Sequence, residues 1–285
     1  MNYVNCNLCP RQCGVDRTLG KTGYCKAPAA AVVSKTMLHK WEEPILAPKG
    51  KSGAIFFGGC NLGCVYCQNY AISRVPQGKA MDGAALREEM ENLIGQGAEN
   101  IDLVSPTPYL PTVLEALAQP LPVPVIYNTG GYERVDAIAA LKGKVDIYLP
   151  DLKYADNALA KGLSTAPDYF QTATAAIREM ATQVGRPQFK AEQLQKGVVI
   201  RHLILPGQIE NSLKVLDWIG DTFAPGEVLV SLMRQYTPTP GMTAPFDRPV
   251  TEEEYQAVLS WMYLNGIEGF TQEAAAVGTD FIPDF

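Results

Sequence analysis

The chain has 285 residues, of which 47% are hydrophobic and 19% charged, a composition typical of a globular protein with one large α/β domain or two smaller ones. Its formal net charge is −6 and its pI is about 5.1, so no basic surface is available for phosphates and we expect no nucleic-acid partner. No apolar run of about 18 residues exists and the N-terminus lacks an apolar signal core, so we expect a cytoplasmic protein without a membrane partner.

The chain begins with a cysteine-rich segment, in which Cys6, Cys9, Cys13 and Cys25 follow the spacing C-x2-C-x3-C-x11-C. Thiols stay reduced in the cytoplasm, so clustered cysteines favour a metal site over disulfides. Four thiolates close a tetrahedral site, and both zinc and a second iron–sulfur cluster suit such ligands. Free thiols are the remaining interpretation. We predict that residues 1–50 form a metal-binding segment and a linker.

Residues 31–50 are predicted to hold a strand around Val32-Val33 and a linker that leads into the core. The linker contains His39 and the polar stretch Trp41-Glu42-Glu43-Pro44. A histidine in such a place is more often a surface or packing residue than a metal ligand, and we expect His39 to be one of these.

A second cysteine group follows an apolar run. Ala54 to Phe57 is predicted to be a strand, Gly58-Gly59 ends it, and Cys60, Cys64 and Cys67 come next with the spacing C-x3-C-x2-C. Loops at the carboxyl ends of parallel strands carry the ligand sites of α/β folds. Three soft thiolates leave one metal position for a non-protein ligand. Buried thiols or half of a zinc site are the alternative.

Six strand–helix units are predicted from residue 54 onward, because apolar runs of strand length alternate with segments of helical periodicity. The strands are expected at 54–57, 101–105, 123–127, 145–149, 198–205 and 228–233. The helices are expected at 82–96, 111–119, 133–141, from about 153 to 183 with an interruption at Pro167, and at 211–222 and 252–264. Residues 186–197 are expected to be a polar excursion and 269–285 mostly loop.

The short connections imply a parallel sheet with right-handed crossovers. A doubly wound sheet fits the alternation as well as a barrel does. We predict one unit over residues 51–240, followed by a C-terminal helix and tail over 241–285.

Polar residues gather where the predicted strands end, and in a barrel these ends face the active site. The residues are Ser105, Thr107 and Tyr109 after the second strand, Asn128 and Thr129 after the third, Asp151 and Lys153 after the fourth, Arg201 within the fifth, and Arg234 and Tyr236 after the sixth. We interpret Tyr109, Arg234 and Tyr236 as substrate contacts or as packing at the barrel mouth. His202 follows Arg201 and is expected on the opposite face of the strand.

The stretch Phe56-Phe57-Gly58-Gly59-Cys60 to Tyr70 resembles the cluster loop of the radical S-adenosylmethionine (SAM) enzymes. The resemblance implies that Cys60, Cys64 and Cys67 hold a catalytic [4Fe-4S] cluster whose fourth iron is chelated by SAM. It implies reductive cleavage of SAM to a 5′-deoxyadenosyl radical that abstracts hydrogen. It also implies a partial (βα)6 TIM-like barrel of α/β class, and it gives Tyr66 a place near the adenine.

Further motifs resemble the pyruvate formate-lyase activating enzyme. Asn128-Thr129-Gly130-Gly131 is similar to its D-T-N-G turn, Asp151-Leu152-Lys153 matches D-L-K, and the strand around Arg201 is similar to I-R-Y-x-x-x-P-G. The resemblance implies that Asp151 helps to hold a monovalent cation, and that Lys153 and Arg201 contact SAM. For Arg201 a structural ion pair is the alternative, and for Asp151 an ordinary turn residue.

The chain departs from the superfamily at Ser105-Pro106-Thr107, where a Gly-Gly-Glu turn often meets the amino group of SAM. Either backbone carbonyls and the hydroxyls of Ser105 or Thr107 replace that turn, or SAM binds differently. The resemblance implies a glycyl-radical enzyme, another peptide or a small molecule as substrate, and an electron donor such as flavodoxin or ferredoxin. The alternative function is an iron–sulfur protein for electron transfer or assembly that does not turn over SAM.

Overall fold

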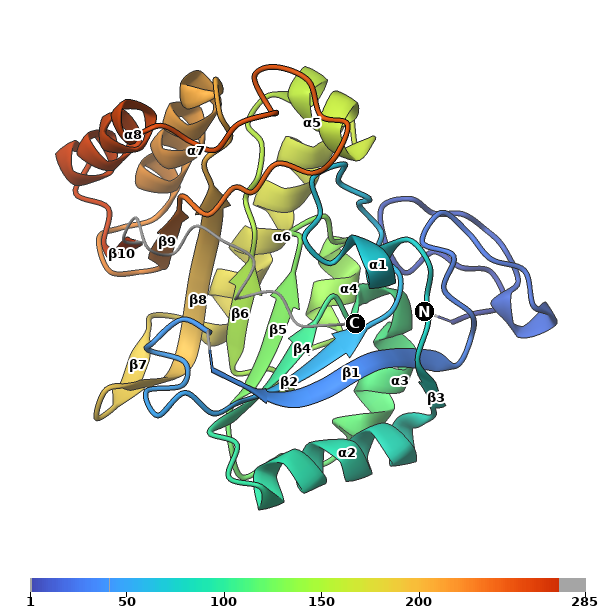
Figure 1. Ribbon diagram of the computed structural model, residues 1–285. Helices are drawn as coiled ribbons and strands as arrows, with labels where there is room; N and C mark the ends of the chain where they lie inside the picture. Colours follow the sequence, from blue (N-terminus) through green and yellow to red (C-terminus); the bar gives the residue numbers. More distant parts are fainter. Residues whose placement is uncertain (1, 41, 272–285) are drawn as a thin grey trace.

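The computed structural model describes residues 2–40 and 42–271 (Figure 1). Its centre is one ten-stranded sheet with the order β10-β9-β8-β6-β5-β4-β2-β1-β3, and β7 pairs with β8 at its side. The strands are β1 (Ala31–His39), β2 (Ser52–Phe57), β3 (Lys79–Met81), β4 (Asn100–Val104), β5 (Val125–Thr129), β6 (Ile147–Pro150), β7 (Gln188–Lys190), β8 (Gln193–Leu203), β9 (Leu229–Met233) and β10 (Gly269–Thr271).

The sheet is mostly parallel. All neighbouring pairs from β2 through β4, β5, β6, β8 and β9 to β10 are parallel, whereas β1 pairs antiparallel with both β2 and β3. Within the described residues β3 and β10 form the two ends of the strand order, so the sheet does not close on itself. The expected α/β fold with a partial parallel barrel is therefore confirmed, with an additional antiparallel edge at β1.

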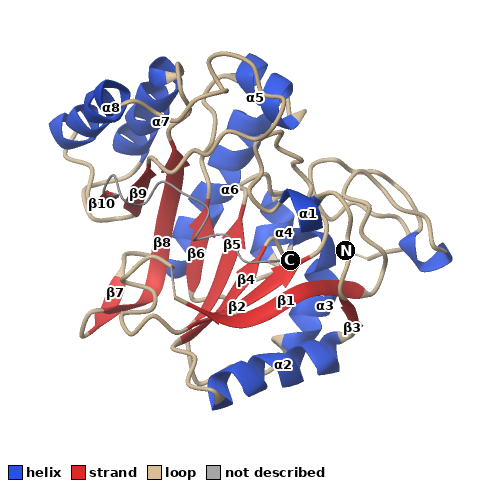
Figure 2. Ribbon diagram, in the orientation of Figure 1, coloured by secondary structure: helices blue, strands red, loops and turns tan. Residues whose placement is uncertain are grey.

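Helices follow the parallel strands and pack on one face of the sheet, as Figure 2 shows for α4 and α6 behind β5 and β6. They are α1 (Tyr70–Ser73), α2 (Gly83–Gly95), α3 (Leu110–Ala116), α4 (Val135–Ala139), α5 (Asn157–Ser164), α6 (Tyr169–Val184), α7 (Ile209–Thr222) and α8 (Glu252–Leu264), with the 3-10 turns η1 (Arg17–Leu19) and η2 (Thr107–Tyr109). The Asp82 side chain caps α2, as its position before the periodic stretch predicts. No helix of the described chain has both the length and the apolar character needed to cross a membrane.

On the other face of the sheet, the side chains change from apolar to polar along the strands. Successive side chains of a strand point to opposite faces, so every second residue lies on this inner face. An apolar cluster lies there that includes Ile126, Leu149 and Val199. Two residues further along the same strands or just after them come Asn128, Asp151 and Arg201, respectively, and these three line a cavity. The inner face is thus apolar in the middle of the strands and polar at their carboxyl ends, which places the charged residues at one end of the barrel.

The loop between β1 and β2 closes the apolar part of the inner face. Leu46 from this loop is fully buried among the inward residues of β5, β6, β8 and β9. Its backbone carbonyl accepts a hydrogen bond of 2.8 Å from Asn100 Nδ2 at the start of β4, and Leu194 N at the start of β8 donates 2.8 Å to Ile45 O. This loop therefore forms the floor of the cavity described below, which its residues Glu42, Glu43 and Pro44 line.

Several sequence expectations need correction. The excursion at 186–197 is a hairpin in which β7 pairs antiparallel with the first part of β8. The third strand begins two residues later than expected, so that Asn128 and Thr129 belong to β5 itself. Of the expected loop 269–285, Gly269–Thr271 is β10 and the remainder lies outside the described residues. The sheet contains strands from all three expected segments, because β1 pairs with β2 and β10 pairs with β9.

Candidate active site

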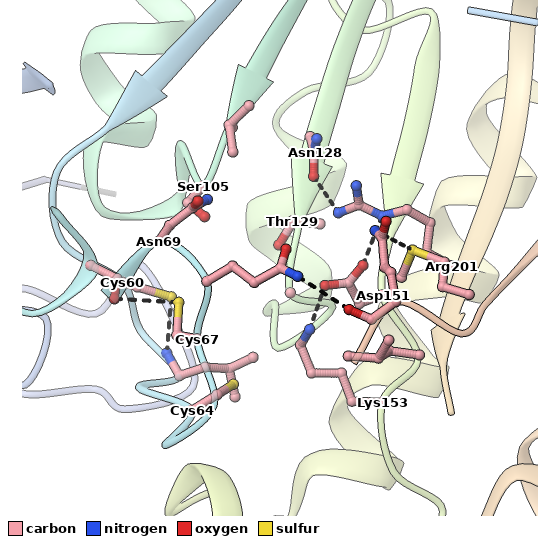
Figure 3. A pocket seen from close by; sticks show the side chains of 18 of the residues that line it. Cys60, Cys64, Cys67, Asn69, Ser105, Asn128, Thr129, Asp151, Lys153 and Arg201 are labelled. Atoms are coloured by element: carbon pink, nitrogen blue, oxygen red, sulfur yellow. Dashed lines mark hydrogen bonds and ion pairs between the residues drawn. The ribbon is translucent and has the colours of Figure 1, made fainter. Parts of the chain in front are cut away.

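The three cysteines of the C-x3-C-x2-C motif line one cavity of about 700 Å³ at the carboxyl ends of the strands (Figure 3). They belong to the loop between β2 and α1, which turns at Gly59 and Gly63, both in the left-handed region that favours glycine. Leu62 N donates to Cys60 Sγ at 3.5 Å, Ser164 Oγ to Cys64 Sγ at 3.0 Å and Ser73 Oγ to Cys67 Sγ at 3.5 Å. Each sulfur is thus oriented by a hydrogen bond from the protein.

Two of these three thiols, Cys60 and Cys67, have raised pKa values in the structure. Burial and the neighbouring thiols raise the pKa of Cys60 to about 12, and the same causes raise the pKa of Cys67. The free Cys60 thiol is therefore protonated at neutral pH, and a metal that binds it must displace the proton. No disulfide joins any of the seven cysteines. The donor set fits a cluster with three thiolate ligands.

The opposite wall of the cavity carries an ion-pair network (Figure 3). The Asp151 carboxylate accepts from Lys153 Nζ at 2.5 Å and from Arg201 Nε at 2.8 Å, while Arg201 Nη2 donates to Asn128 Oδ1 at 2.6 Å. Burial alone would raise the pKa of Asp151, but Arg201 and Lys153 outweigh it and hold that pKa below its usual value. The network keeps two cations and one carboxylate fixed beside the cysteine loop. The sequence places Asn128, Asp151, Lys153 and Arg201 at strand ends, and the structure brings all four together.

Three acidic residues that the sequence reasoning did not single out lie near Arg201, and two of them, Glu42 and Glu43, line the cavity. Glu42 Oε1 is 4.0 Å from Arg201 Nη1, and Glu43 Oε1 accepts from Ser231 Oγ at 2.5 Å. Asp102, fully buried in β4, lies beside Glu42 and accepts from Asn128 Nδ2 at 3.2 Å. Burial and the nearby Glu42 carboxylate raise the pKa of Asp102 well above its usual value. An acidic residue within the apolar strand Ile101–Val104 was the signal that could have revealed it.

The remaining expected cofactor contacts fall into two groups. Tyr66, Ser105 and Thr129 line the cavity, and Ser105 does so with a left-handed backbone, which is unusual for a residue with a side chain. Thr107 does not line the cavity, because it is buried and its hydroxyl donates to Glu133, which also accepts from Thr129. Burial raises the pKa of Glu133 to about 7.

The three candidates for substrate contact pack away from the cavity. Tyr109 is fully buried and donates to Gly58 O at 2.8 Å, and Tyr236 donates to Phe246 O at 2.8 Å. Arg234 pairs with Glu252 at 2.8 Å and lies over the Tyr255 ring. Of the two interpretations that the sequence left open for them, packing is the one this arrangement supports.

The two histidines both serve packing. His39 is buried and its ring meets Phe56 edge to face, with centroids 6.2 Å apart, although it also borders the cavity. His202 is fully buried on the face opposite Arg201, where its ring nitrogens lie 2.7 Å from Leu152 O and 2.9 Å from Ser212 Oγ. The strand alternation predicts this placement of His202.

The N-terminal cysteines are neighbours but are not arranged as a finished metal site. Burial raises the pKa of Cys9 to about 12 and also raises the pKa of Cys25, and the nearby thiols add to both effects. Cys13 Sγ accepts a hydrogen bond of 3.3 Å from Tyr24 N. Across residues 2–40 and 42–271, no three Cys, His, Asp or Glu side chains are placed as ligands of a single metal ion.

Comparisons with known proteins agree with the site and the fold. The family model of the radical SAM superfamily matches residues 54–219, more than half of the chain. An uncharacterized protein of Methanocaldococcus jannaschii is 32% identical over 246 residues, which are 83% of this chain and 67% of that protein. A second uncharacterized protein of the same organism is 28% identical over 92 residues, or 26% of each chain.

Two solved structures share the fold. Methylornithine synthase superposes with a TM-score of 0.50 and 17% identity over 74% of this chain and 68% of that one. SuiB of Streptococcus suis, bound to its precursor peptide SuiA, gives a TM-score of 0.51 and 12% identity over 76% of this chain and 47% of that one. Both likenesses concern the arrangement of helices and strands alone.

Proposed function

Since the chain belongs to the radical SAM superfamily, we propose that it is an enzyme that cleaves SAM reductively at a [4Fe-4S] cluster held by Cys60, Cys64 and Cys67. One observation carries the proposal: three oriented thiols and a fixed set of charged side chains line the same cavity. When bound, the reduced cluster supplies the electron that splits the sulfonium of SAM and yields a 5′-deoxyadenosyl radical.

The chain's own residues bind and orient the reactants. Lys153 and Arg201 are the cations available for the carboxylate of SAM, and Asp151 fixes both of them through hydrogen bonds of 2.5 and 2.8 Å. Tyr66 is buried beside the cysteines and donates or accepts a hydrogen bond of 2.6 Å with Tyr154, which makes its ring a rigid surface for the adenine. Such fixed groups reduce the reorganisation that the reaction requires.

The target of hydrogen abstraction is proposed to be a glycine of a glycyl-radical enzyme or another peptide. Support comes from the motifs that this chain shares with activating enzymes, the Asp151-Leu152-Lys153 turn and the strand around Arg201. A flavodoxin or ferredoxin is the proposed electron donor. Mixing the reduced protein and SAM with a candidate glycyl-radical enzyme tests the target, because an activated partner acquires a glycyl radical visible by EPR.

A metal at Cys6, Cys9, Cys13 and Cys25, either zinc or a second iron–sulfur cluster, is part of the proposal. The support is that four cysteines fall within 20 residues of the sequence, from Cys6 to Cys25. A monovalent cation near Asp151 is also part of the proposal. Lys153 and Arg201 compete with such an ion for this carboxylate, because both form ion pairs with it.

The first experiment is anaerobic reconstitution, followed by reduction, addition of excess SAM and measurement of 5′-deoxyadenosine. The wild-type protein is expected to form the nucleoside and to hold about four irons per chain, or about eight if the N-terminal site is a second cluster. Cys64→Ala is expected to lose both the cluster and the nucleoside. Val65→Ala is the matched control in the same loop, because Val65 is 44% exposed and should leave both unchanged.

A full cluster without any nucleoside, with candidate substrates added, would contradict the proposal. It would indicate an iron–sulfur protein that serves electron transfer or assembly.

A further inference from the structure

The cysteine-rich N-terminal segment contacts the cluster-binding loop along three of its residues. An added Cβ at Gly59, the residue before Cys60, would lie 2.7 Å from Cys25 O, so the two backbones are in close contact there. Arg11, between Cys9 and Cys13, donates from Nε to Asn61 O at 2.9 Å and from Nη2 to Leu62 O at 3.1 Å. These contacts fall on both sides of Cys60.

The guanidinium of Arg11 is held in place by its surroundings. It lies 3.9 Å from the centre of the Tyr24 ring and 5.2 Å from that of Tyr132. Its remaining hydrogen bonds go to Ser164 O at 3.0 Å and to Thr165 O and Oγ1 at 2.6 and 3.2 Å. A planar guanidinium with several donors and an aromatic partner is a rigid support that lysine does not reproduce. Arg11 thus joins the N-terminal segment, the cluster loop and the end of α5.

The carbonyls between Cys60 and Cys64 are all bound on the side away from the cavity. Leu62 O also accepts from Tyr24 Oη at 2.8 Å, and Gly63 O accepts from Arg74 Nη2 at 2.8 Å. Because a peptide N–H points opposite to its C=O, fixing these carbonyls outward helps to fix the amide directions on the cysteine side. One such amide, Leu62 N, faces Cys60 Sγ. Hydrogen bonds to cluster sulfurs are among the factors that set cluster stability and potential.

We propose that the N-terminal segment positions the cluster-binding loop, with Arg11 and Tyr24 as the positioning residues. The inference rests on the proposed function, since it concerns the loop that would hold the cluster. It assigns the cysteine-rich segment a role that its four thiols alone do not reveal. Neither residue lines the cavity, so both act through the loop.

The test is the rate at which a chelator removes iron from the cluster, together with the EPR spectrum of the reduced protein with and without SAM. Arg11→Ala is expected to lose iron about tenfold faster than wild type and to alter the spectrum, because loss of such supporting contacts typically costs 10–100-fold in metal affinity. Arg11→Lys should fail to restore the wild-type rate. Tyr24→Phe, which keeps the ring and removes the hydroxyl, should give a smaller increase.

Arg87→Ala is the matched control. Arg87 of α2 also donates to backbone carbonyls, those of Ala116, Gln119 and Pro120, but it does not line the cavity. Iron loss and EPR spectra of this variant should equal those of wild type. If Arg11→Ala proves poorly folded, Tyr24→Phe carries the test alone.

A second experiment tests whether Cys13 and Arg11 support the cluster-binding loop through the same set of contacts. Cys13→Ala removes the acceptor of Tyr24 N and should also speed iron loss, and the double variant with Arg11→Ala should be no worse than the more affected single variant.

Wild-type iron retention and spectra in both Arg11→Ala and Tyr24→Phe would overturn the inference. The readout does not need SAM turnover, so it separates the two proposals. A wild-type protein that forms no 5′-deoxyadenosine, but whose iron retention depends on Arg11, would refute the proposed function and leave this inference standing. If the wild-type protein forms 5′-deoxyadenosine but Arg11→Ala loses iron at the wild-type rate, the proposed function stands and this inference is refuted.

Discussion

Asp151 is the residue on which the charged wall of the cavity depends. Its side chain is only 12% exposed, and it stands between the two cations that face the cysteine loop. Lys153 and Arg201 would repel each other without it, in a place where little water is present to screen them. The carboxylate is therefore a structural requirement of this wall.

Replacing the Asp151 carboxylate should show how much it contributes to the free energy of unfolding. We expect Asp151→Asn to lower the free energy of unfolding by about 3 kcal/mol, because it leaves two buried cations without their anion. Glu91→Gln, which breaks the exposed pair with Arg87, should lower it by less than about 0.5 kcal/mol. Urea unfolding of the two variants under anaerobic conditions measures both values. Equal losses in the two variants would contradict the idea that the Asp151 network is a buried one.

At the residue scale, a sequence predicts side chains that follow from strand ends and misses those that arrive through loops. Asp151, Lys153 and Arg201 could be found because a charged residue at the end of an apolar strand has a defined direction. Glu42 and Glu43 could not, since they belong to a loop whose path into the barrel depends on the packing of Leu46. Thr107 pairs with Glu133 for a similar reason, as this contact joins two loops far apart in sequence.

At the element scale, the alternation of apolar runs and helical periodicity located six of the seven parallel strands of the described chain near their true positions and missed only β10. The helix at 252–264 has the expected bounds because Thr251 and Glu254 form a complete capping box. The hairpin of β7 and β8 was missed because its outer strand, Gln188–Lys190, is exposed and carries no apolar face. The antiparallel pairing of β1 with β2 depends on long-range register, which local sequence does not encode.

Protonation of His202, which is buried on the outer face of β8, makes the stability of the protein depend on pH. Its Nδ1 must donate to the Leu152 carbonyl, which leaves Nε2 to accept from the Ser212 hydroxyl, so the neutral ring is fully satisfied. Burial lowers the pKa of His202 to about 4 from an ordinary value of 6.5. The stability that His202 contributes is therefore fully present above pH 6.5 and is lost as the pH falls through 4.

The expected loss is about 3 kcal/mol of unfolding free energy between these pH values, since each pKa unit corresponds to about 1.4 kcal/mol. Urea midpoints measured from pH 7 to pH 4 test this in wild type and in His202→Gln. The variant should start less stable but should lose less stability on acidification. Parallel pH profiles for the two proteins would show that another group is responsible.

At the scale of the whole molecule, the loop between β1 and β2 that forms the cavity floor contributes both to the stability of the fold and to the geometry of the site. Leu46 fills the space between the inward residues of β5, β6, β8 and β9, and the same loop presents Glu42 and Glu43 to the cavity. The open sheet leaves this space to be filled by the chain itself, because an apolar inner face exposed to water would be unfavourable. Where the floor sits therefore determines where the two acidic residues lie.

Shortening Leu46 tests this link. Leu46→Ala is expected to lower the free energy of unfolding by about 2–5 kcal/mol, the usual range when a fully buried leucine leaves a cavity. Leu264→Ala is the control, because its side chain is 79% exposed, and it should change stability by less than about 0.5 kcal/mol. If the floor also positions Glu42 and Glu43 below Arg201, Leu46→Ala should weaken SAM binding under conditions where the protein remains folded, while Leu264→Ala should not. A destabilised Leu46→Ala protein that binds SAM with unchanged affinity would show that the floor supports the fold but not the site.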